Sequence, residues 1–337
     1  MAMTKNVNQR LPEPGDRMLW ICFYGFGDAL EFAADAYNVK RLFPDVHAAF
    51  LTYPKHAELL RVQPYLDEVL TGRKNLYAEW WNTLQKIRAG RYKWVISYHG
   101  GGHSAWLARF SGAGRRIGTC KVLPFCNLYQ VPLEPWRRSF ISEIEGSIAD
   151  RSVPVIFAPA EDREAGRALL SHLPGCRLFA AIGGGWDAKL WPPERWAEFL
   201  RPLAARGWGV VLNGHGPLEE AMGRHIEEAV ASPNLLNLVG KLDFKKMAGV
   251  VHCCSLTVGN DTGPLHLAAL SGVPVLGLFN FSTSDSMNLR MPWFREFCAS
   301  DHVAEKRTPL KALPVEPVAE AFDVFAGEFL PKAFAWR

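Results

Sequence analysis

Residues 259–266, Gly-Asn-Asp-Thr-Gly-Pro-Leu-His, combine the residue types and the spacing of an anion-binding turn. An apolar run precedes them and small residues follow from Leu267, so the predicted order is strand, glycine-bracketed turn, helix. The start of such a helix presents free backbone N–H groups and the positive end of the helix dipole, and both favour a phosphate. Asp261 would repel a phosphate but suits hydrogen bonds from neighbouring hydroxyl groups. The motif therefore favours a nucleotide-sugar ligand.

The rest of the chain alternates apolar runs with helical patterns. A helix follows Gly27 and stops at Pro44, and glycine turns follow several of the expected strands. We predict strands at residues 18–23, 47–51, 93–98, 177–182, 208–212, 250–258 and 274–279, glycine turns at 25–27, 100–102 and 183–185, and a helix at 193–206. This alternation predicts parallel sheets with helices on their faces. Ligands of such sheets bind at the carboxyl ends of the strands, so a cleft between the two halves is the expected site.

A chain of 337 residues is long for one hydrophobic core and predicts two domains. Residues 152–159 contain two prolines and no clear periodicity, which places the boundary near them. We expect a flexible tail at 1–16, an N-terminal domain at 17–155, a C-terminal domain at 156–312 and a helical segment at 313–337. Val318, Phe322, Phe325 and Phe329 fall on one face of that last helix, which suggests that it packs back across both domains.

Composition and cysteine usage are those of a globular intracellular protein. Hydrophobic residues make up 48% of the chain and charged residues 21%, and the apolar runs are far shorter than the ~18 residues of a membrane span. The polar first sixteen residues lack the apolar core of a signal peptide. The seven cysteines include no Cys-x-x-Cys pair, which favours reduced thiols over disulfides or a zinc site. We therefore expect a cytoplasmic location.

Positive charge is concentrated in the first half of the chain, which has a net charge of +4 overall. The basic clusters include Arg73-Lys74, Arg115-Arg116 and Arg137-Arg138. Three explanations are open: an anionic acceptor, the anionic surface of a membrane, and an ordinary solvated face.

Several segments resemble glycosyltransferase family 9, the lipopolysaccharide heptosyltransferases. The segments that carry the resemblance are residues 189–196 (Lys-Leu-Trp-Pro-Pro-Glu-Arg-Trp), 237–241 (Asn-Leu-Val-Gly-Lys) and 259–269, and in the first half 27–28 (Gly-Asp), 41–44, 104–109 and 115–118. They follow the family's order over most of the chain. The implied fold class is α/β of the GT-B type, with two Rossmann-like domains whose parallel sheets face a central cleft. The N-terminal domain would bind the acceptor and the C-terminal domain the nucleotide-sugar.

The resemblance implies an inverting, metal-independent glycosyltransferase. Its donor would be ADP-heptose, bound as a substrate with no resident cofactor. Its acceptor would be a hydroxyl group of a lipopolysaccharide core or a related anionic glycan or glycolipid. The implied location is cytoplasmic, with peripheral contact at the cytoplasmic face of the inner membrane, and nucleic acid is not an expected partner. The sequence contains no Asp-x-Asp pair that would suggest a metal ion.

Glycosyl transfer needs a base for the acceptor proton, positive charge for the leaving diphosphate and an in-line arrangement. The resemblance assigns the base to Asp28 and the phosphate contact to Lys189, while Glu31, on the same helical face as Asp28, is a reserve base. The expected donor-binding residues are Gly183, Gly184, Lys189, Glu219 or Glu220 for the ribose, Asp261, Thr262, Gly263 and His266. The expected acceptor-binding residues are Gly27, His99, His103 and Arg115, and no metal ligand is expected.

Simpler roles are open for these residues. Asp28, Asp261 and Thr262 are good helix caps, Lys189 has the character of a surface lysine, and the histidines suit structural roles. Two other functions are also open: a non-catalytic GT-B protein that binds nucleotide or glycan, and an NAD-dependent oxidoreductase. For the oxidoreductase, Gly25 and Gly27 follow a strand, but Leu30 occupies the third glycine position of the dinucleotide motif.

Overall fold

The computed structural model describes residues 11–74, 77–97, 102–119, 131–133, 152–280, 289, 291–302 and 309–330. The chain forms two compact units. The first comprises Met1–Tyr24 and Phe32–Asp150, and the second comprises Gly25–Glu31 and Arg151–Arg337. A short segment from the first half of the chain therefore belongs to the second unit.

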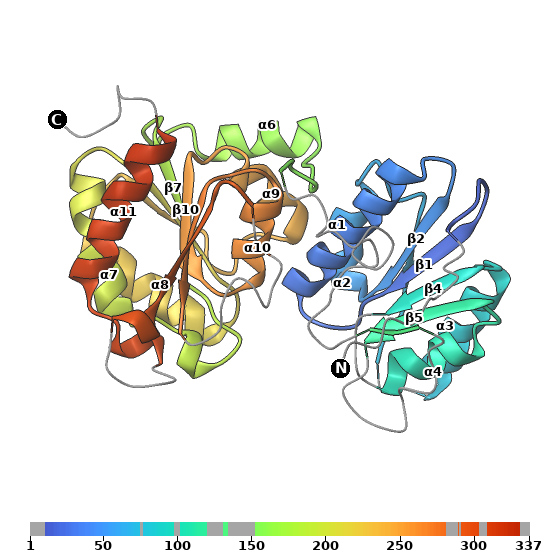
Figure 1. Ribbon diagram of the computed structural model, residues 1–337. Helices are drawn as coiled ribbons and strands as arrows, with labels where there is room; N and C mark the ends of the chain where they lie inside the picture. The colour runs from blue at the N-terminus through green and yellow to red at the C-terminus, as the bar shows by residue number, and fades with distance from the viewer. Residues whose placement is uncertain are drawn as a thin grey trace, which may run out of the picture. The chain divides into compact units, whose positions relative to one another are not determined.

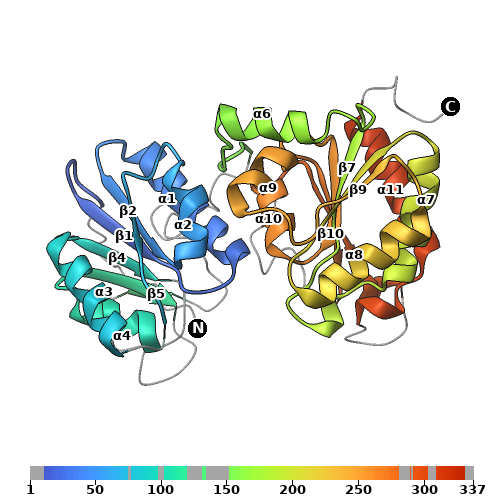
Figure 2. The ribbon, with the colours of Figure 1, turned by 180° about the vertical axis from the view of Figure 1, so that it is seen from behind.

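The first unit is built on a six-stranded sheet in the order β3-β2-β1-β4-β5-β6, and every described pairing in it is parallel. Its elements are β1 (Arg17–Ile21), α1 (Phe26–Leu42), β2 (His47–Thr52), α2 (Pro54–Arg61), β3 (Glu68–Thr71), α3 (Tyr77–Ala89), β4 (Trp94–Ser97), α4 (Gly102–Phe110), β5 (Arg115–Thr119) and β6 (Val131–Leu133). The strands β1 and β2 are apolar and buried along nearly their whole length, as expected for strands covered on both faces. Helices α3 and α4 pack on one face against Leu19 and Ile21, and α1 and α2 cover the other face (Figures 1 and 2).

The second unit has a six-stranded sheet in the order β12-β11-β10-β7-β8-β9, again parallel in every described pairing. Its elements are α6 (Ala160–Leu169), β7 (Arg177–Ala181), η2 (Asp187–Lys189), α7 (Pro193–Ala205), β8 (Gly209–Asn213), α8 (Pro217–Val230), β9 (Leu235–Asn237), α9 (Phe244–Val251), β10 (Leu256–Asn260), α10 (Gly263–Leu270), β11 (Val275–Phe279), β12 (Phe294–Cys298), η4 (Ala299–Asp301), η5 (Leu310–Ala312) and α11 (Val315–Phe329). Helices α7, α8 and α11 cover one face of this sheet, and α9 and α10 cover the other (Figures 1 and 2).

Both sheets have the strand order of a dinucleotide-binding fold. In each, three strands run outward from the centre in one direction, and the chain then returns to the centre and runs outward in the other. The direction changes between β1 and β4 in the first sheet and between β7 and β10 in the second. Ligands of open parallel sheets bind beyond the carboxyl ends of the strands at this change of direction. The two-unit α/β architecture predicted from the sequence is confirmed.

Helix α11 packs on the second unit. Of the stripe predicted from its periodicity, Val318, Phe322 and Phe325 are buried, and Phe329 is half-buried against the same core. The ring of Phe322 lies 5.4 Å from that of Phe199 and 5.5 Å from that of Trp208. Packing of this helix across both units stays a prediction.

One predicted strand was wrong. Residues 250–258 do not form a single strand, because Val250 and Val251 complete helix α9 and the strand begins only at Leu256. Helix α9 begins at the N-cap Asp243, whose side chain accepts a hydrogen bond from the N–H of Lys246. The helix packs closely on α6, since a Cβ at Gly249 would lie 2.1 Å from the carbonyl oxygen of Asp162. Tertiary packing, which the local apolar pattern does not report, decides between helix and strand here.

No helix in the described part of the chain is long and apolar enough to cross a membrane. The cysteines that the structure describes (Cys22, Cys176, Cys253, Cys254 and Cys298) are free thiols.

Candidate active site

The turns after β7 and β10 are tied together by Asn260. Its buried side-chain amide donates hydrogen bonds to the carbonyl oxygens of Ile182 (2.9 Å) and Gly183 (3.1 Å), which begin the glycine turn after β7. Thr262 turns its hydroxyl back to the carbonyl oxygen of Asn260, 3.2 Å away. Asn260 thus shapes the site, although the sequence marked it only as one letter of the motif.

Glu219 joins a third turn to this pair. Its carboxylate accepts hydrogen bonds from the N–H of Gly184 (2.9 Å), after β7, and from the N–H of His215 (2.6 Å), after β8. A Cβ at Gly183 would lie 2.3 Å from the Glu219 carboxylate, so a side chain there would displace Glu219 from its present position. The other candidate, Glu220, lies against Gly240 instead. Of the two glutamates, Glu219 is the one within the glycine turns.

Lys189 and Asp261 form an ion pair at the centre of these turns. Their side chains are only 19% and 4% exposed, so Lys189 is not an ordinary surface lysine. Trp191, two residues further on, is fully buried and donates its indole N–H to the carbonyl oxygen of Leu313 at 2.9 Å, which anchors the segment. Burial alone would raise the pKa of Asp261, but the hydrogen bond and charge of His266 and the charge of Lys189 outweigh it and lower that pKa.

His266 extends this pair into a chain of alternating charges. Its Nε2 lies 3.4 Å from Oδ1 of Asp261, and its Nδ1 lies 2.9 Å from Oε1 of Glu31. Burial disfavours the charged imidazole, but the bonds to the two carboxylates outweigh burial and raise the pKa of His266 to about 9. His266 is therefore a cation at neutral pH. The sequence suggested that His266 packs or orients the loop, and its contacts with Glu31 and Asp261 are compatible with that role.

The first turn of α1 packs against the first turn of α10. A Cβ at Gly27 would lie 2.9 Å from Cγ of His266, and one at Gly263 would lie 3.0 Å from the ring of Phe26. Phe26 in turn stacks on Phe244, with ring centroids 3.8 Å apart. These contacts explain why residues 25–31 group with the second unit, and they give Gly27 a packing role.

The two candidate bases differ in their surroundings. Asp28 lies within the first turn of α1, not before it, so it is not an N-cap, and it is partly exposed. Glu31 is 1% exposed and engaged with His266. Asp28 is therefore accessible to solvent, whereas Glu31 is not.

The start of α10 has the form expected of an anion site. The helix begins at Gly263, and Thr262 is its N-cap residue. The Thr262 side chain makes no capping bond, because it donates to Asn260 instead. The N–H groups of Thr262 and Gly263 therefore stand at the positive end of the helix beside Lys189.

The expected acceptor residues are not all brought together. His103 opens α4 at the carboxyl edge of the first sheet, with its ring 5.2 Å from that of Phe23. Burial, together with the charge of Lys74, lowers the pKa of His103. Arg115 lies at the amino end of β5, paired in register with Trp94, and its guanidinium lies 5.9 Å from that ring. Arg115 therefore lies at the amino ends of the strands, whereas His103 lies at their carboxyl ends. His99 lies outside the described residues.

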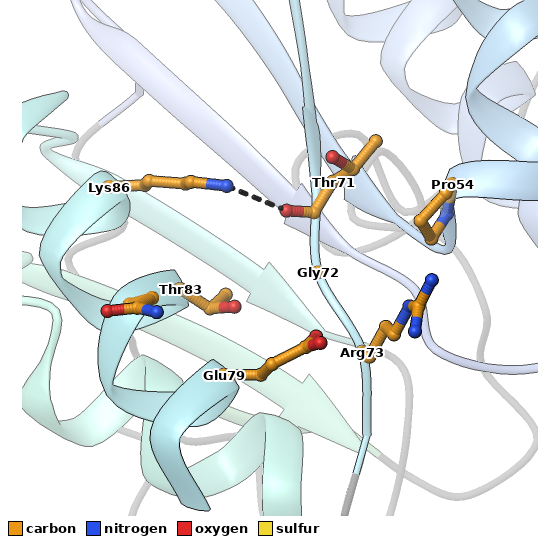
Figure 3. Close-up of a pocket in the computed structure, with 8 residues that line it drawn as sticks. Pro54, Thr71, Gly72, Arg73, Glu79, Thr83 and Lys86 are labelled. Carbon is orange, nitrogen blue, oxygen red and sulfur yellow. Dashed lines mark hydrogen bonds between the residues drawn. The ribbon is translucent and has the colours of Figure 1, made fainter. Parts of the chain in front are cut away.

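A polar pocket of about 260 Å³ lies at the carboxyl edge of the first sheet (Figure 3). It is lined by Pro54, Thr71, Gly72, Arg73, Glu79, Asn82, Thr83 and Lys86. Lys86 reaches from α3 to the carbonyl oxygen of Thr71 at 3.4 Å, and Glu79 points towards the segment that carries Arg73 (Figure 3). The sequence drew attention to Arg73 as part of a basic cluster, but it did not predict this cavity.

Comparison with known proteins decides the class of the protein. The model of glycosyltransferase family 9 (heptosyltransferase) matches residues 169–305, which contain every donor-side residue described above except those of α1. Lipopolysaccharide heptosyltransferase 3 of Escherichia coli is 22% identical over 88% of this chain and 95% of its own length. Lipopolysaccharide heptosyltransferase 1 of Pseudomonas aeruginosa is 27% identical over 78% of each chain. The chain is thus similar to glycosyltransferase family 9 over much of its second half, and to lipopolysaccharide heptosyltransferases over most of its length.

Solved structures agree with this similarity at the level of the fold. A family 9 glycosyltransferase from Veillonella parvula superposes with a TM-score of 0.80 at 18% identity, covering 94% of this chain and 99% of its own. An Escherichia coli heptosyltransferase solved with ADP gives a TM-score of 0.72 at 18% identity, covering 92% and 100%. The fold is therefore GT-B. The family model and the heptosyltransferase relatives, not the solved structures, support a glycosyltransferase over the oxidoreductase and the non-catalytic alternatives.

Proposed function

We propose that this enzyme transfers heptose from ADP-heptose to a hydroxyl group of a lipopolysaccharide core acceptor, with inversion and without a metal ion. The observation that carries the proposal is the buried Lys189–Asp261 pair at the start of α10. The first turn of α10 packs against the turn that bears Asp28. The heptosyltransferase relatives and the ADP bound to the Escherichia coli enzyme support the choice of donor.

The donor diphosphate would bind at the start of α10. Lys189 and the N–H groups of Thr262 and Gly263 supply positive charge and hydrogen bonds to its oxygens. Asp261, paired with Lys189, would accept hydrogen bonds from sugar hydroxyl groups. Glu219 can receive the ribose hydroxyl groups, because each of its oxygens has a second lone pair beyond its backbone bond.

The reaction then proceeds in one displacement. Asp28 takes the proton of the acceptor hydroxyl as its oxygen forms a bond to the anomeric carbon. The bond from that carbon to the diphosphate breaks on the opposite face, which inverts the configuration, and ADP leaves with its new negative charge against Lys189 and the α10 N-terminus. No step requires a metal ion, since Lys189 and the helix terminus supply the positive charge.

The acceptor would be held by the first unit. Arg73 and Lys86 give the pocket of Figure 3 two cations, which suit a phosphate or carboxylate group of the lipopolysaccharide core. His103 lies at the same edge of the sheet, whereas Arg115 does not, so we omit Arg115 from the acceptor site. We propose that the enzyme works at the cytoplasmic face of the inner membrane in peripheral contact with it.

A transfer assay tests the proposal. Purified enzyme, ADP-heptose and a core acceptor in the presence of EDTA should give a product whose anomeric configuration, measured by NMR, is opposite to that of the donor. Retention of configuration, dependence on added Mg²⁺, or turnover with UDP-sugars alone would contradict the proposal.

A further inference from the structure

The chain of charges at the donor turn ends on Glu31. This residue is 1% exposed and is the last residue of the segment that groups with the second unit. Its Oε1 lies 2.9 Å from Nδ1 of His266, whose other nitrogen faces Asp261. A residue of α1 is thereby linked through one side chain to the turn expected to hold the donor.

Asp28 and Glu31 share one face of α1. Residues three apart on a helix are neighbours, so whatever fixes Glu31 also fixes the turn that carries Asp28. The close approach of Gly27 to the His266 ring brings this turn directly against α10. The position of the base relative to the donor turn therefore depends on how His266 is held.

Because these groups are buried, each charge needs a partner of opposite charge. Glu31, Asp261 and His266 are each nearly inaccessible to water, and a buried charge is tolerated only when it is paired. The charged groups on the elements around His266 are Glu31 and Asp28 on α1, Asp261 after β10 and, through Asp261, Lys189 on η2. Removing the charge of Glu31 would leave His266, among the ion pairs of the described residues, with Asp261 alone, and Asp261 is also paired with Lys189.

We propose that Glu31 is a positioning residue for glycosyl transfer, which acts through His266 to hold the turn bearing Asp28 in register with Asp261 and the donor turn. This inference rests on the proposed function. The raised pKa of His266, to about 9, agrees with it, because both carboxylates then contact a cation over the physiological pH range.

Asp35 provides a matched control on the same helix. It lies one turn beyond Glu31, is fully buried, and accepts a hydrogen bond from the indole N–H of Trp20 at 2.8 Å, within the first unit. It is a buried carboxylate like Glu31, but this contact lies within the first unit and involves neither His266 nor Asp261. Loss of a buried carboxylate as such is therefore tested by Asp35→Asn, and loss of the link to His266 by Glu31→Gln.

The experiment compares Glu31→Gln, Glu31→Asp and Asp35→Asn with the wild type. Glu31→Gln should lower kcat by about 10- to 100-fold, the cost of misplacing a reacting group by about an ångström, while the Kd for ADP changes less than about threefold. Removing the negative charge lowers the pKa of His266, so the alkaline limb of the kcat profile should move to lower pH by about one unit or more. Glu31→Asp keeps the charge and should retain the wild-type alkaline limb. Asp35→Asn should lower the unfolding temperature without moving that limb.

NMR titration of His266 provides a readout that needs no acceptor. Its pKa should fall in Glu31→Gln and stay unchanged in Asp35→Asn. The inference is overturned if Glu31→Gln keeps the wild-type kcat and pH profile, if the His266 pKa does not move, or if kcat falls equally in Asp35→Asn. Failure of the wild-type enzyme to transfer heptose overturns the proposed function instead, and the NMR titration still decides the link between Glu31 and His266.

Discussion

The two units of the enzyme present charge in opposite ways. In the second unit, Asp261, His266 and Glu31 are buried and paired around Lys189, and backbone turns hold them in place. At the carboxyl edge of the first unit, Arg73 and Lys86 are exposed side chains on the rim of an open pocket. Buried, paired charges are rigid and weakly screened by salt, whereas exposed charges are flexible and strongly screened. We infer that the donor side is preorganised and that the acceptor side adapts to its ligand.

The largest expected effect is at the proposed base. Asp28→Asn should lower kcat about 1,000-fold, within the range for loss of a general base, because the acceptor oxygen then attacks while still protonated. Calorimetry should give a nearly unchanged Kd for ADP, since Asp28 contributes nothing to diphosphate binding. Asp45→Asn, an exposed carboxylate just beyond the same helix, is the control and should turn over normally. A near wild-type rate in Asp28→Asn would show that Asp28 is not the base.

A smaller effect is expected at the acceptor edge. The double variant Arg73→Ala, Lys86→Ala should raise the KM for the acceptor about tenfold, equivalent to about 1.4 kcal/mol, and leave the Kd for ADP unchanged. The acceptor KM of the wild type should also rise with added salt much more than the ADP Kd does. Arg88→Ala, on the same helix α3 but outside the pocket, is the matched control. If the double variant weakens ADP binding and spares the acceptor, the assignment of the two sides is wrong.

The smallest expected effect is a pH dependence of the free energy of unfolding, caused by His266 in the second unit. His266 has its pKa raised from an ordinary 6.5 to about 9, so the fold favours its protonated form. The stability that this provides is fully present below pH 6.5 and is lost as the pH rises through about 9. Urea unfolding followed between these pH values should show the decline in the wild type and a weaker one in His266→Asn. Equal slopes in the two proteins would show that His266 is not a buried cation.

The sequence predicted the second unit better than the first, for a physical reason. The donor turn lies in one contiguous stretch, so its glycines, Asp261 and Thr262 stand together in the chain, and the strand-turn-helix order around them is correct. The pocket of the first unit, which we propose binds the acceptor, draws its residues from α2, from α3 and from the end of β3 and the segment after it, and no local pattern marks side chains that meet only after folding. Arg115 begins β5, at the opposite end of the strands from His103, and the apolar pattern alone did not predict where this strand would begin.

Local sequence patterns also could not predict the contacts that complete the proposed donor site. Asn260 bonds to a turn 78 residues earlier in the chain, and Glu31 meets His266 from the other half of the sequence. The apolar run at 250–258 was wrongly predicted as one strand because the packing of α9 on α6 is likewise a long-range effect. Periodicity predicts elements, whereas partners distant in the chain decide which polar residues shape a site.

The central claim is that Lys189 and the start of α10 form the diphosphate half of the donor site. Calorimetric titration of ADP and of AMP into the wild type and into Lys189→Met tests it directly, with Lys246→Met, an exposed lysine paired with Asp243, as control. The wild type and the control should bind ADP at least about tenfold more tightly than AMP, as expected for a charge-assisted contact to the second phosphate. Lys189→Met should lose most of that preference. Equal affinities for ADP and AMP in the wild type, or a full preference retained by Lys189→Met, would contradict the claim.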